Sequence, residues 1–556
     1  MKKTTSIIST LLTGAILWAS GGIISAKISN ESKLRRNLTT FNEIVTQLDL
    51  NFVDSVDADK ILDASLSGLY NAYDPYTVYY NSDHQDELET ITSGKYGGIG
   101  AYLNEYKGST YIASPIKGSP ADRAGIRAGD QILRVDTIDV SRKGSNYVTS
   151  ILRGSPSTSV DLVMKRPYTA DSIYSVTLTR EVLQRPSVSL SKVIGNTGYI
   201  AISTFIESTP EEVKAVFEGF KADPRVENIV IDLRSNGGGL VEPAIDLLGY
   251  FLPKGTKVLT IKRKEPIAET TYKTTHQPLF PDMPLAILID GGSASASEVM
   301  AGAIQDLDRG ILVGTRSFGK GLVQNTLPIS TGGILKITTG KYYTPSGRLI
   351  QAIDYSNLNE DGSVRRIPDS LTREFKTLHG RTVRDGGGLT PDSVVNDSNL
   401  YNLLAYKIIN NRSDFRFATK YLATHPDVAS PDEFVLSDEA FEEFKKSINP
   451  EDFKYERELV SSLKELQKAA TDNGFDDPEI KAGFDNLARL LTRDLNQELD
   501  KNRRMVNFLV GSEIMEQKYY NEGRIEYMLR DDKELDVARS ILNSDHYYKL
   551  LNITKR

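Results

Sequence analysis

The chain has 556 residues, which is too long for one compact domain and predicts about three or four domains. With 39% apolar and 25% charged residues, it has the composition of a globular protein rather than a disordered or fibrous one. The net charge is −7 without a basic block, so the chain lacks the electrostatic footprint of a nucleic-acid-binding protein. It has no cysteines, which excludes disulfides, thiolate metal sites and cysteine-protease chemistry.

Residues 1–26 have the pattern of an export signal. Lys2 and Lys3 give a positive start, and the run from Ser6 to Ser25 is largely apolar and carries no charge. This pattern is typical of a Sec-type signal peptide or of an uncleaved N-terminal membrane anchor, because about 20 apolar residues can span a bilayer. We therefore expect export to the periplasm or cell envelope. Both the cleaved and the anchored form remain open.

Residues 27–92 are predicted to be a helical region. Apolar side chains recur there at spacings of three and four residues, as in amphipathic helices; they include Phe41, Ile44, Val45, Leu48, Ile61, Leu62, Leu66 and Leu69. The sequence Asp-Pro-Tyr (74–76) breaks this pattern.

Residues 93–181 change to short β-rich runs separated by glycine and proline. The stretch GSPADRAGIRAGDQILRVD (118–136) predicts a capped short helix, a turn and a strand, and it resembles a PDZ domain. In PDZ domains a glycine-rich loop offers N–H groups to a peptide's terminal carboxylate, while the peptide extends a sheet edge. The resemblance implies that Gly98, Ile99 and Gly100 bind the peptide. The alternative is that these glycines only make a tight turn.

Residues 182–410 alternate between strands and helices. The runs 228–233, 285–289 and 311–314 are continuously apolar and predict buried strands, with a helix over 244–251. Such alternation favours a layered α/β architecture. Residues 411–556 are predicted to be a charged, helical C-terminal domain that serves packing or oligomerisation, and no chemistry is visible there.

The segment Ser-Ala-Ser-Ala-Ser-Glu (293–298) follows a predicted buried strand and opens a helix. A hydroxyl placed there stands at the end of a strand, beside free N–H groups of a helix N-terminus. Acyl transfer needs this combination of a nucleophile and donors for the oxyanion. The alternative is plain helix capping, the usual role of serine before a helix.

A catalytic serine also needs a base, and none of the five histidines lies in this segment. Lys320 follows in the run Ser-Phe-Gly-Lys-Gly-Leu-Val-Gln (317–324), where two glycines flank it. Desolvation lowers a lysine pKa from about 10.4 and lets the amine act as a base. Ser–Lys pairs are a known variant of the Ser–His–Asp arrangement.

The region 292–324 resembles the active site of the carboxy-terminal processing peptidases, or tail-specific proteases. Their pattern is S-A-S-A-S-E, then A-G-A-x-Q-D, then F-G-K-G-x-V-Q. In that family the second serine is the nucleophile and the lysine follows 25 positions later, which selects Ser295 and Lys320 here. The glutamine that orients the lysine corresponds to Gln324. Two acidic residues, Glu298 and Asp306, match family positions and are interpreted as support for the site.

The run Asp-Leu-Arg-Ser-Asn-Gly-Gly-Gly (232–239) resembles the family motif D-L-R-x-N-x-G-G. The last glycine of that motif supplies one oxyanion-hole N–H, which implies Gly239, with Gly238 as the neighbouring alternative. Ala296, the residue after the nucleophile, would supply the second. The non-catalytic alternatives are a plain turn and a phosphate-binding loop, but no Walker lysine follows these glycines.

Further family landmarks occur in order at 74–77, 342–347 and 388–392, so the resemblance covers residues 35–400. It implies a multidomain α/β protein with a crotonase-like protease core, an inserted PDZ domain and helical N- and C-terminal regions. It also implies a serine endopeptidase that uses no cofactor or metal and cleaves proteins or peptides captured by their free C-terminal tails. Assembly into a homo-oligomer and use of an adaptor lipoprotein are further expectations.

Two other functions are weighed against this one. A non-enzymatic PDZ scaffold of the cell envelope predicts a missing catalytic residue, yet Ser295, Lys320 and Gln324 are all present. A histidine-dependent PDZ protease predicts a G-N-S-G-G nucleophile motif and a protease domain ahead of the PDZ domain. Neither feature is found in this sequence.

Overall fold

The computed structural model describes residues 31–555, apart from 82–89, 91, 171, 265–268, 359–363, 396–401, 454–455, 476 and 492–493. The predicted export signal at 1–26 lies outside the described residues. In the part of the chain that is described, no helix is both long enough and apolar enough to cross a membrane. The chain forms two compact units, 1–75 and 76–556.

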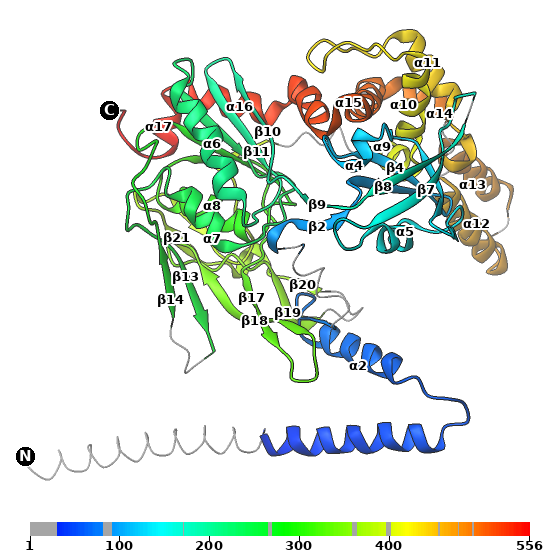
Figure 1. Ribbon diagram of the computed structural model, residues 1–556, viewed down its shortest axis with the longest axis horizontal. Coiled ribbons are helices and arrows are strands. Elements are labelled where there is room, and N and C mark those ends of the chain that lie inside the picture. The colour runs from blue at the N-terminus through cyan, green and yellow to red at the C-terminus, as the bar shows by residue number, and fades with distance from the viewer. Residues whose placement is uncertain are drawn as a thin grey trace, which may run out of the picture. The chain divides into compact units, whose positions relative to one another are not determined.

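The first unit is helical where the structure describes it (Figure 1). It contains a helix over 31–51 and α2 (Ala58–Tyr73). Asp57 begins α2 as its N-cap and accepts hydrogen bonds from the N–H groups of Asp59 and Lys60. The expected amphipathic helices are therefore formed, but many of their apolar side chains are exposed; those of 31–51 include Leu34, Leu38, Phe41, Ile44 and Leu48.

The predicted helical region 27–92 also contains a strand, which belongs to the second unit. After Pro75 the chain forms β1 (Val78–Tyr80), which pairs antiparallel with β18 (Ile334–Tyr343). A β-branched residue followed by two tyrosines suits a strand. Pairing with a distant strand decided the structure here, and periodicity could not reveal it.

The PDZ-like region is an antiparallel sheet with two helices against it. Its strand order is β3-β4-β5-β7-β8, with β6 paired to β5. The strands are β3 (Ala101–Tyr106), β4 (Ser109–Pro115), β5 (Gln131–Val135), β6 (Ile138–Asp139), β7 (Ser159–Lys165) and β8 (Ile173–Thr179). The helices are α4 (Pro120–Arg123), which Ser119 caps as predicted, and α5 (Ser145–Leu152). A separate pair, β2 (Lys95–Gly98) and β9 (Glu181–Gln184), joins the two ends of this region.

A six-stranded sheet forms the centre of the α/β region, in the order β10-β11-β12-β15-β16-β23. Strand β10 (Val188–Ile194) is antiparallel to its neighbour and the others run parallel. They are β11 (Thr197–Ile202), β12 (Asn228–Asp232), β15 (Leu285–Ile289), β16 (Ile311–Gly314) and β23 (Ser393–Val394). The predicted buried strands 228–233, 285–289 and 311–314 are confirmed as β12, β15 and β16 to within one residue.

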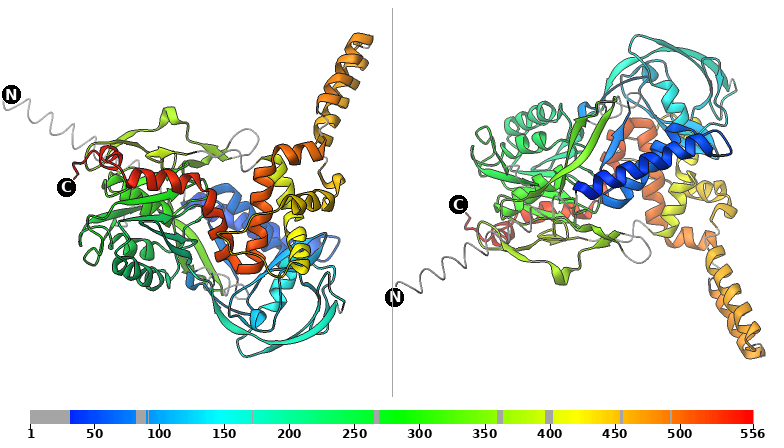
Figure 2. Two further views of the ribbon diagram at one scale, coloured as in Figure 1. Left: turned by 90° about the horizontal axis from the view of Figure 1, so that it is seen from above. Right: turned by 90° about the horizontal axis from the view of Figure 1, so that it is seen from below.

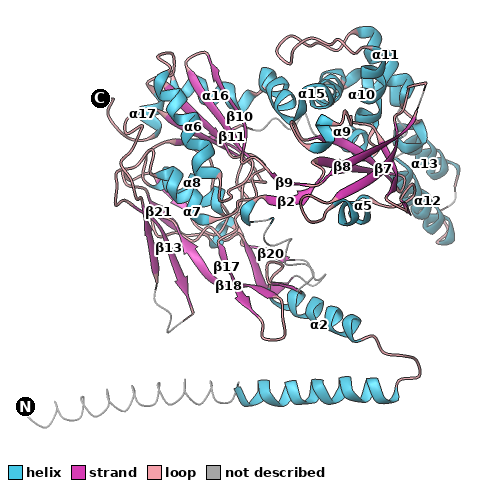
Figure 3. Ribbon diagram, in the orientation of Figure 1, coloured by secondary structure: helices cyan, strands magenta, loops and turns pink. Residues whose placement is uncertain are grey.

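Helices cover both faces of this sheet (Figure 3). One face packs against α6 (Thr209–Ala222), α7 (Val241–Leu248) and α8 (Ala296–Asp306). The other face packs against α16 (Lys533–Leu542) and α17 (His546–Leu550), which come from the end of the chain. Parallel strands that are apolar on both sides need such a double cover. The predicted C-terminal region 411–556 therefore completes the core sheet as well as forming helices of its own.

A second, more exposed sheet contains β1, β18, β13 and β14 in that order, with β17 also paired to β18. Its other strands are β13 (Lys257–Arg263), β14 (Thr270–Lys273) and β17 (Leu322–Pro328). Two small hairpins follow: β19 (Ile353–Leu358) with β20 (Val364–Arg366), and β21 (Glu374–Lys376) with β22 (Thr382–Arg384).

The remaining C-terminal helices share one apolar core. They include α9 (Leu403–Asn410), α10 (Ser413–Thr424), α11 (Asp438–Ser447), α14 (Leu495–Lys501) and α15 (Arg503–Met528). Between them, α12 (Glu456–Asp472) and α13 (Pro478–Leu491) form a hairpin that extends away from the neighbouring helices (Figure 2). Leu459, Leu466 and Leu487 on this hairpin are exposed.

Candidate active site

Ser295 lies in a sharp turn between β15 and α8. Its backbone has φ 57° and ψ −116°, a positive φ that a residue with a side chain rarely adopts. Such strain persists only where the surrounding structure imposes it, and a strained strand-to-helix turn is a known way of exposing a nucleophilic serine. Ser295 is also the N-cap residue of α8. The capping interpretation is thus right about its place in the helix but does not explain the strain.

The three serines of the segment differ in environment. Ser293 is fully buried, and its hydroxyl donates to the Leu233 carbonyl (2.7 Å). Ser297 is also fully buried, and its hydroxyl donates to the Asn236 carbonyl (2.9 Å). Only Ser295 is partly exposed among the three. Of these serines it is the one whose side chain a substrate could reach.

Glu298 connects the serine segment to the lysine segment. Its carboxylate accepts hydrogen bonds from the N–H groups of Ser295 (3.0 Å) and Lys320 (2.9 Å) on one oxygen. The other oxygen accepts from the Ser317 hydroxyl (2.5 Å) and the Gly319 N–H (2.7 Å). Burial raises the pKa of Glu298 to about 7, while these four donors act in the opposite direction. The carboxylate thereby fixes the distance between the two backbones.

Lys320 is partly buried in the loop before β17. Gly319, with φ 86°, allows the tight turn that carries the lysine there. The Tyr342 hydroxyl of β18 donates to the carbonyls of both Lys320 and Ser295, the latter at 3.2 Å. Burial raises the pKa of Tyr342 well above its usual value, so this hydroxyl stays protonated and remains a donor. Tyr342 therefore links the same two segments as Glu298, through their carbonyls rather than their N–H groups.

Gln324 lies on β17, where the pairing with β18 shifts register between Val323 and Gln324. Its amide donates to the Thr338 hydroxyl of β18 (3.1 Å). The Thr338 N–H in turn donates to the Thr77 hydroxyl (3.4 Å). Gln324 is thus held by neighbours that sequence reasoning did not identify. Its predicted orienting contact with Lys320 stays a prediction.

The glycine run 237–239 lies against the nucleophile turn. A methyl group on Gly238 would come within 2.7 Å of the Ser295 Cβ and 2.9 Å of the Ala296 nitrogen. The Gly238 N–H already donates to the Asn236 side chain (2.9 Å). The Gly239 N–H has no such acceptor among the described residues. This difference favours Gly239 over Gly238 as the predicted oxyanion donor, and the second predicted donor, Ala296, is the first residue of α8.

Asn236 organises this loop although sequence reasoning gave it no role. It is fully buried, and its side-chain N–H donates to the Ile202 carbonyl of β11 (2.8 Å). Its own carbonyl accepts from the Ala294 N–H (3.0 Å). Its place as the fixed asparagine of the motif D-L-R-x-N-x-G-G was the signal that could have revealed it.

Asp306, the second acidic residue of the family pattern, has a different environment from Glu298. Its carboxylate pairs with the buried Arg348 (2.7 Å) and accepts from the Ser346 N–H (3.0 Å). It holds the 344–348 turn in place and stands apart from the reacting groups. The histidines are also elsewhere where described: His276 lies beside Asp246, and His379 beside Asp308.

The predicted peptide-binding loop borders a groove of about 480 Å³ between β3 and α5. The carbonyls of Ile99 and Gly100 accept hydrogen bonds from the N–H groups of Ala121 and Ile116, which attach the loop to α4 and to the residue after β4. The N–H groups of Ile99 and Gly100 donate to none of the described residues. They are therefore available to a carboxylate. Gly98 lies on β2 opposite Glu181 and borders the same groove.

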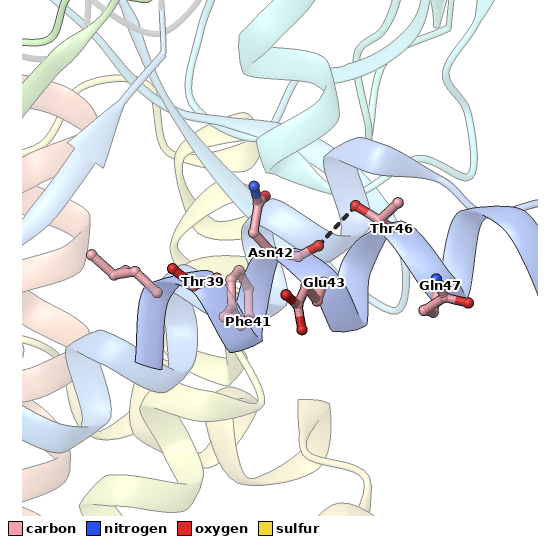
Figure 4. Close-up of a pocket in the computed structure, with 7 residues that line it drawn as sticks. Thr39, Phe41, Asn42, Glu43, Thr46 and Gln47 are labelled. Atoms are coloured by element: carbon pink, nitrogen blue, oxygen red, sulfur yellow. Dashed lines mark hydrogen bonds between the residues drawn. The ribbon is translucent and has the colours of Figure 1, made fainter. Parts of the chain in front are cut away.

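A hollow in the first unit carries no comparable chemistry. Figure 4 shows its lining, which runs from Leu38 to Gln47 on the helix over 31–51. The Thr46 hydroxyl donates to the Asn42 carbonyl of the same helix (2.9 Å). Because all the lining residues come from one helix, the hollow cannot enclose a ligand.

Comparison with known proteins matches three regions of the chain to family models. Residues 196–357 match peptidase family S41, and residues 111–166 match the PDZ domain. Residues 404–542 match a model described as "Probable PDZ-protease, C-terminal helical domain". These matches confirm the predicted multidomain α/β protease with a PDZ domain and a C-terminal helical domain.

Individual relatives extend this result. A "Carboxy-terminal-processing protease" of Bartonella bacilliformis is 32% identical over 345 residues, which is 61% of this chain and 79% of that protein. A "Probable CtpA-like serine protease" of Staphylococcus aureus strain N315 is 33% identical over 62% of this chain and 68% of that protein. The solved photosystem II D1 C-terminal processing protease is 24% identical over 64% of this chain and 87% of its own, with a TM-score of 0.35. A TM-score this low gives no support of its own to the family assignment. From the family matches and these relatives, the chain belongs to peptidase family S41, as a carboxy-terminal-processing serine protease.

Proposed function

We propose that Ser295 is the nucleophile and Lys320 the general base of this protease. The Ser295 hydroxyl passes its proton to the neutral Lys320 amine while its oxygen bonds to the scissile carbonyl carbon. The negative carbonyl oxygen is held by the N–H groups of Gly239 and Ala296. When the C–N bond breaks, Lys320 returns the proton to the leaving amine, and water then hydrolyses the acyl-enzyme. Gln324 orients the lysine.

One observation carries this assignment. The strained, partly exposed Ser295 and the Lys320 loop share a single buried carboxylate, Glu298, and a single hydroxyl, Tyr342. A plain helix cap needs neither link. A non-enzymatic PDZ scaffold likewise has no use for a strained serine.

Substrate capture by the PDZ domain is the second part of the proposal. The groove beside Gly98, Ile99 and Gly100 offers free N–H groups to a terminal carboxylate, and an extended peptide can add to the edge of β3. The substrates are proteins or peptides with free C-terminal tails, met outside the cytoplasm after export of the chain to the periplasm or cell envelope. A homo-oligomer and an adaptor lipoprotein remain part of this expectation.

The test compares the three serines of one segment. Ser295→Ala should abolish cleavage of an unfolded test protein, with unchanged folding by circular dichroism. Ser293→Ala and Ser297→Ala should keep substantial activity, since their hydroxyls bond to backbone carbonyls. Lys320→Arg should also be inactive, because guanidinium does not give up its proton in this pH range. Normal cleavage by Ser295→Ala contradicts the assignment.

A further inference from the structure

The segment that leads into β1 brings an aromatic ring to the active-site lysine. The ε-amino nitrogen of Lys320 lies 4.2 Å from the centroid of the Tyr76 ring. This is well inside the distance at which an ammonium group is attracted to the face of an aromatic ring. The two residues are far apart in sequence, so the contact depends on how the chain folds.

Further contacts hold Tyr76 and the strand that follows it in this place. Strand β1 pairs with β18 from Val78 opposite Lys336 onward. Just before β1, the Thr77 hydroxyl accepts a hydrogen bond from the Thr338 N–H. The hydroxyl of the same Thr338 accepts a hydrogen bond from Gln324. The Tyr76 hydroxyl also lies 2.8 Å from that of Tyr355, and the two rings meet edge to face at 5.7 Å. The ring is therefore fixed by the fold rather than by Lys320.

We propose that Tyr76 is a positioning residue for Lys320: its ring confines the ε-amino group and sets how readily that group gives up its proton. The ring attracts the ammonium form and attracts the neutral amine much less. It therefore opposes the loss of the proton that desolvation favours, and it limits where the long side chain can point. The inference rests on the proposed role of Lys320 as the base.

Other titratable or polar groups contact the lysine loop, and their effects on Lys320 must be distinguished from the effect of Tyr76. Glu298 on α8 accepts from the Lys320 N–H, and Tyr342 on β18 donates to its carbonyl. Because burial raises the pKa of Glu298 to about 7, the pH dependence of activity alone can reflect Glu298. The decisive measurement must report on the Lys320 amine itself.

That measurement is competitive labelling of Lys320 with acetic anhydride across pH, followed by peptide mass spectrometry. It uses the full chain carrying Ser295→Ala, so that no cleavage occurs. Replacing the ring by Tyr76→Leu should lower the Lys320 pKa by about half to one and a half units, as expected from loss of a cation–π contact. Tyr76→Phe keeps the ring and should leave the pKa close to that of the parent.

A neighbouring tyrosine supplies the matched control. Tyr80 lies at the other end of β1, and its ring faces Lys336 at 5.7 Å. Tyr80→Leu removes a ring from the same strand and should leave the Lys320 titration unchanged. If Tyr76→Leu fails to fold, phenylalanine with one, two or three ring fluorines at position 76 keeps the shape and weakens the π face. The Lys320 pKa should then fall with each fluorine.

The outcomes separate this inference from the assignment of the base. An unchanged Lys320 titration in Tyr76→Leu, or in the fluorinated series, overturns the role of Tyr76, as does an equal shift in Tyr80→Leu. In enzyme that retains Ser295, Tyr76→Leu should lower kcat/KM about tenfold at its plateau and move the acid limb to lower pH. Tyr76→Leu could also shift the Lys320 pKa measured by labelling and leave the acid limb of the kcat/KM profile in place. In that case Lys320 is not the base, while Tyr76 still controls its ionisation.

Discussion

At the scale of single residues, one buried carboxylate joins the two halves of the proposed catalytic pair. Ser295 and Lys320 come from different loops, and both backbone N–H groups bond to the same oxygen of Glu298. The sequence placed Glu298 in the family pattern but suggested no contact for it. Its four donors make it the residue on which the relative position of both loops depends.

Replacing the Glu298 carboxylate by an amide of nearly the same shape should lower activity strongly. The amide of Glu298→Gln has one acceptor oxygen and turns N–H donors toward groups that are themselves donors. The two loops should separate, and kcat should fall on the order of tenfold to hundredfold, as expected for misplaced reacting groups. Steady-state kinetics on a peptide substrate measure this. Unchanged kcat would mean that Glu298 has no positioning role.

The same variant tests the ionisation of Glu298. Its pKa is raised in the folded protein, from 4.5 to about 7, so its contribution to stability is fully present below about pH 4.5 and is lost as pH rises through 7. The non-titrating Glu298→Gln protein lacks that loss. Urea unfolding from pH 4.5 to 8 should therefore show wild type losing stability relative to the variant, on the order of 3 kcal/mol. A constant difference would contradict the raised pKa.

At the scale of elements, the end of the chain holds the loop that carries Gly239, the proposed oxyanion donor. Arg234, at the start of that loop, pairs with Asp232 (2.5 Å) on β12 and with Asp532 (2.5 Å) at the start of α16. Glu534 of α16 is a third carboxylate in contact with it. Tyr199 of β11 also donates to Asp232 (2.8 Å). Helix α16 is therefore linked to the active site as well as covering the sheet.

This surplus of carboxylates predicts an asymmetric response to substitution. Arg234→Met leaves three acidic groups close together without their cation, and should cost on the order of 3 to 5 kcal/mol of stability as well as lowering kcat. Glu534→Gln should cost less than about 1 kcal/mol, because Asp232 and Asp532 still pair with Arg234 and burial raises the pKa of Glu534. Urea unfolding and kcat of both variants test this. Equal losses in the two would contradict it.

At the scale of the whole molecule, recognition and cleavage are assigned to separate parts of the chain. The groove beside Ile99 and Gly100 belongs to the PDZ region, and the Ser295 turn belongs to the six-stranded sheet. In the proposed function, a substrate bound by its tail in one part has to reach the other. Binding of the tail can therefore be measured without cleavage, in the full chain carrying Ser295→Ala.

A peptide with a free apolar C-terminus should bind that protein about tenfold to hundredfold more tightly than its amidated form. The reason is that the loop N–H groups form charge-assisted hydrogen bonds only with a carboxylate. Gly100→Ala should abolish the difference, since its Cβ would lie 2.2 Å from that of Ser119. Gly108→Ala is the matched control, with a similar positive φ (74° against 79°) but open space around its Cβ. Isothermal titration calorimetry measures both, and equal affinity for acid and amide would remove the basis for C-terminal recognition.

Sequence alone determined the features that local chemistry dictates. The apolar runs that became β12, β15 and β16, the capped helix α4 and the serine turn before α8 were all predictable, because each depends on residues close together in the chain. The motif spacing also selected Ser295 from three serines, and the structure finds the other two buried. The motif favoured Gly239 over Gly238 as the oxyanion donor, and the hydrogen bond from the Gly238 N–H to the Asn236 side chain adds a structural reason for that preference.

Only the tertiary structure decided what depends on contacts between distant segments. Strand β1 formed in a region predicted to be helical because β18 offered it a partner. Helices α16 and α17 joined the core sheet because its second face was apolar and uncovered. Tyr76 contacts Lys320, and the Lys320 loop contacts Glu298, for the same reason. Burial and pairing between segments that are distant in the chain set these contacts, and periodicity and spacing within a short window carry no information about them.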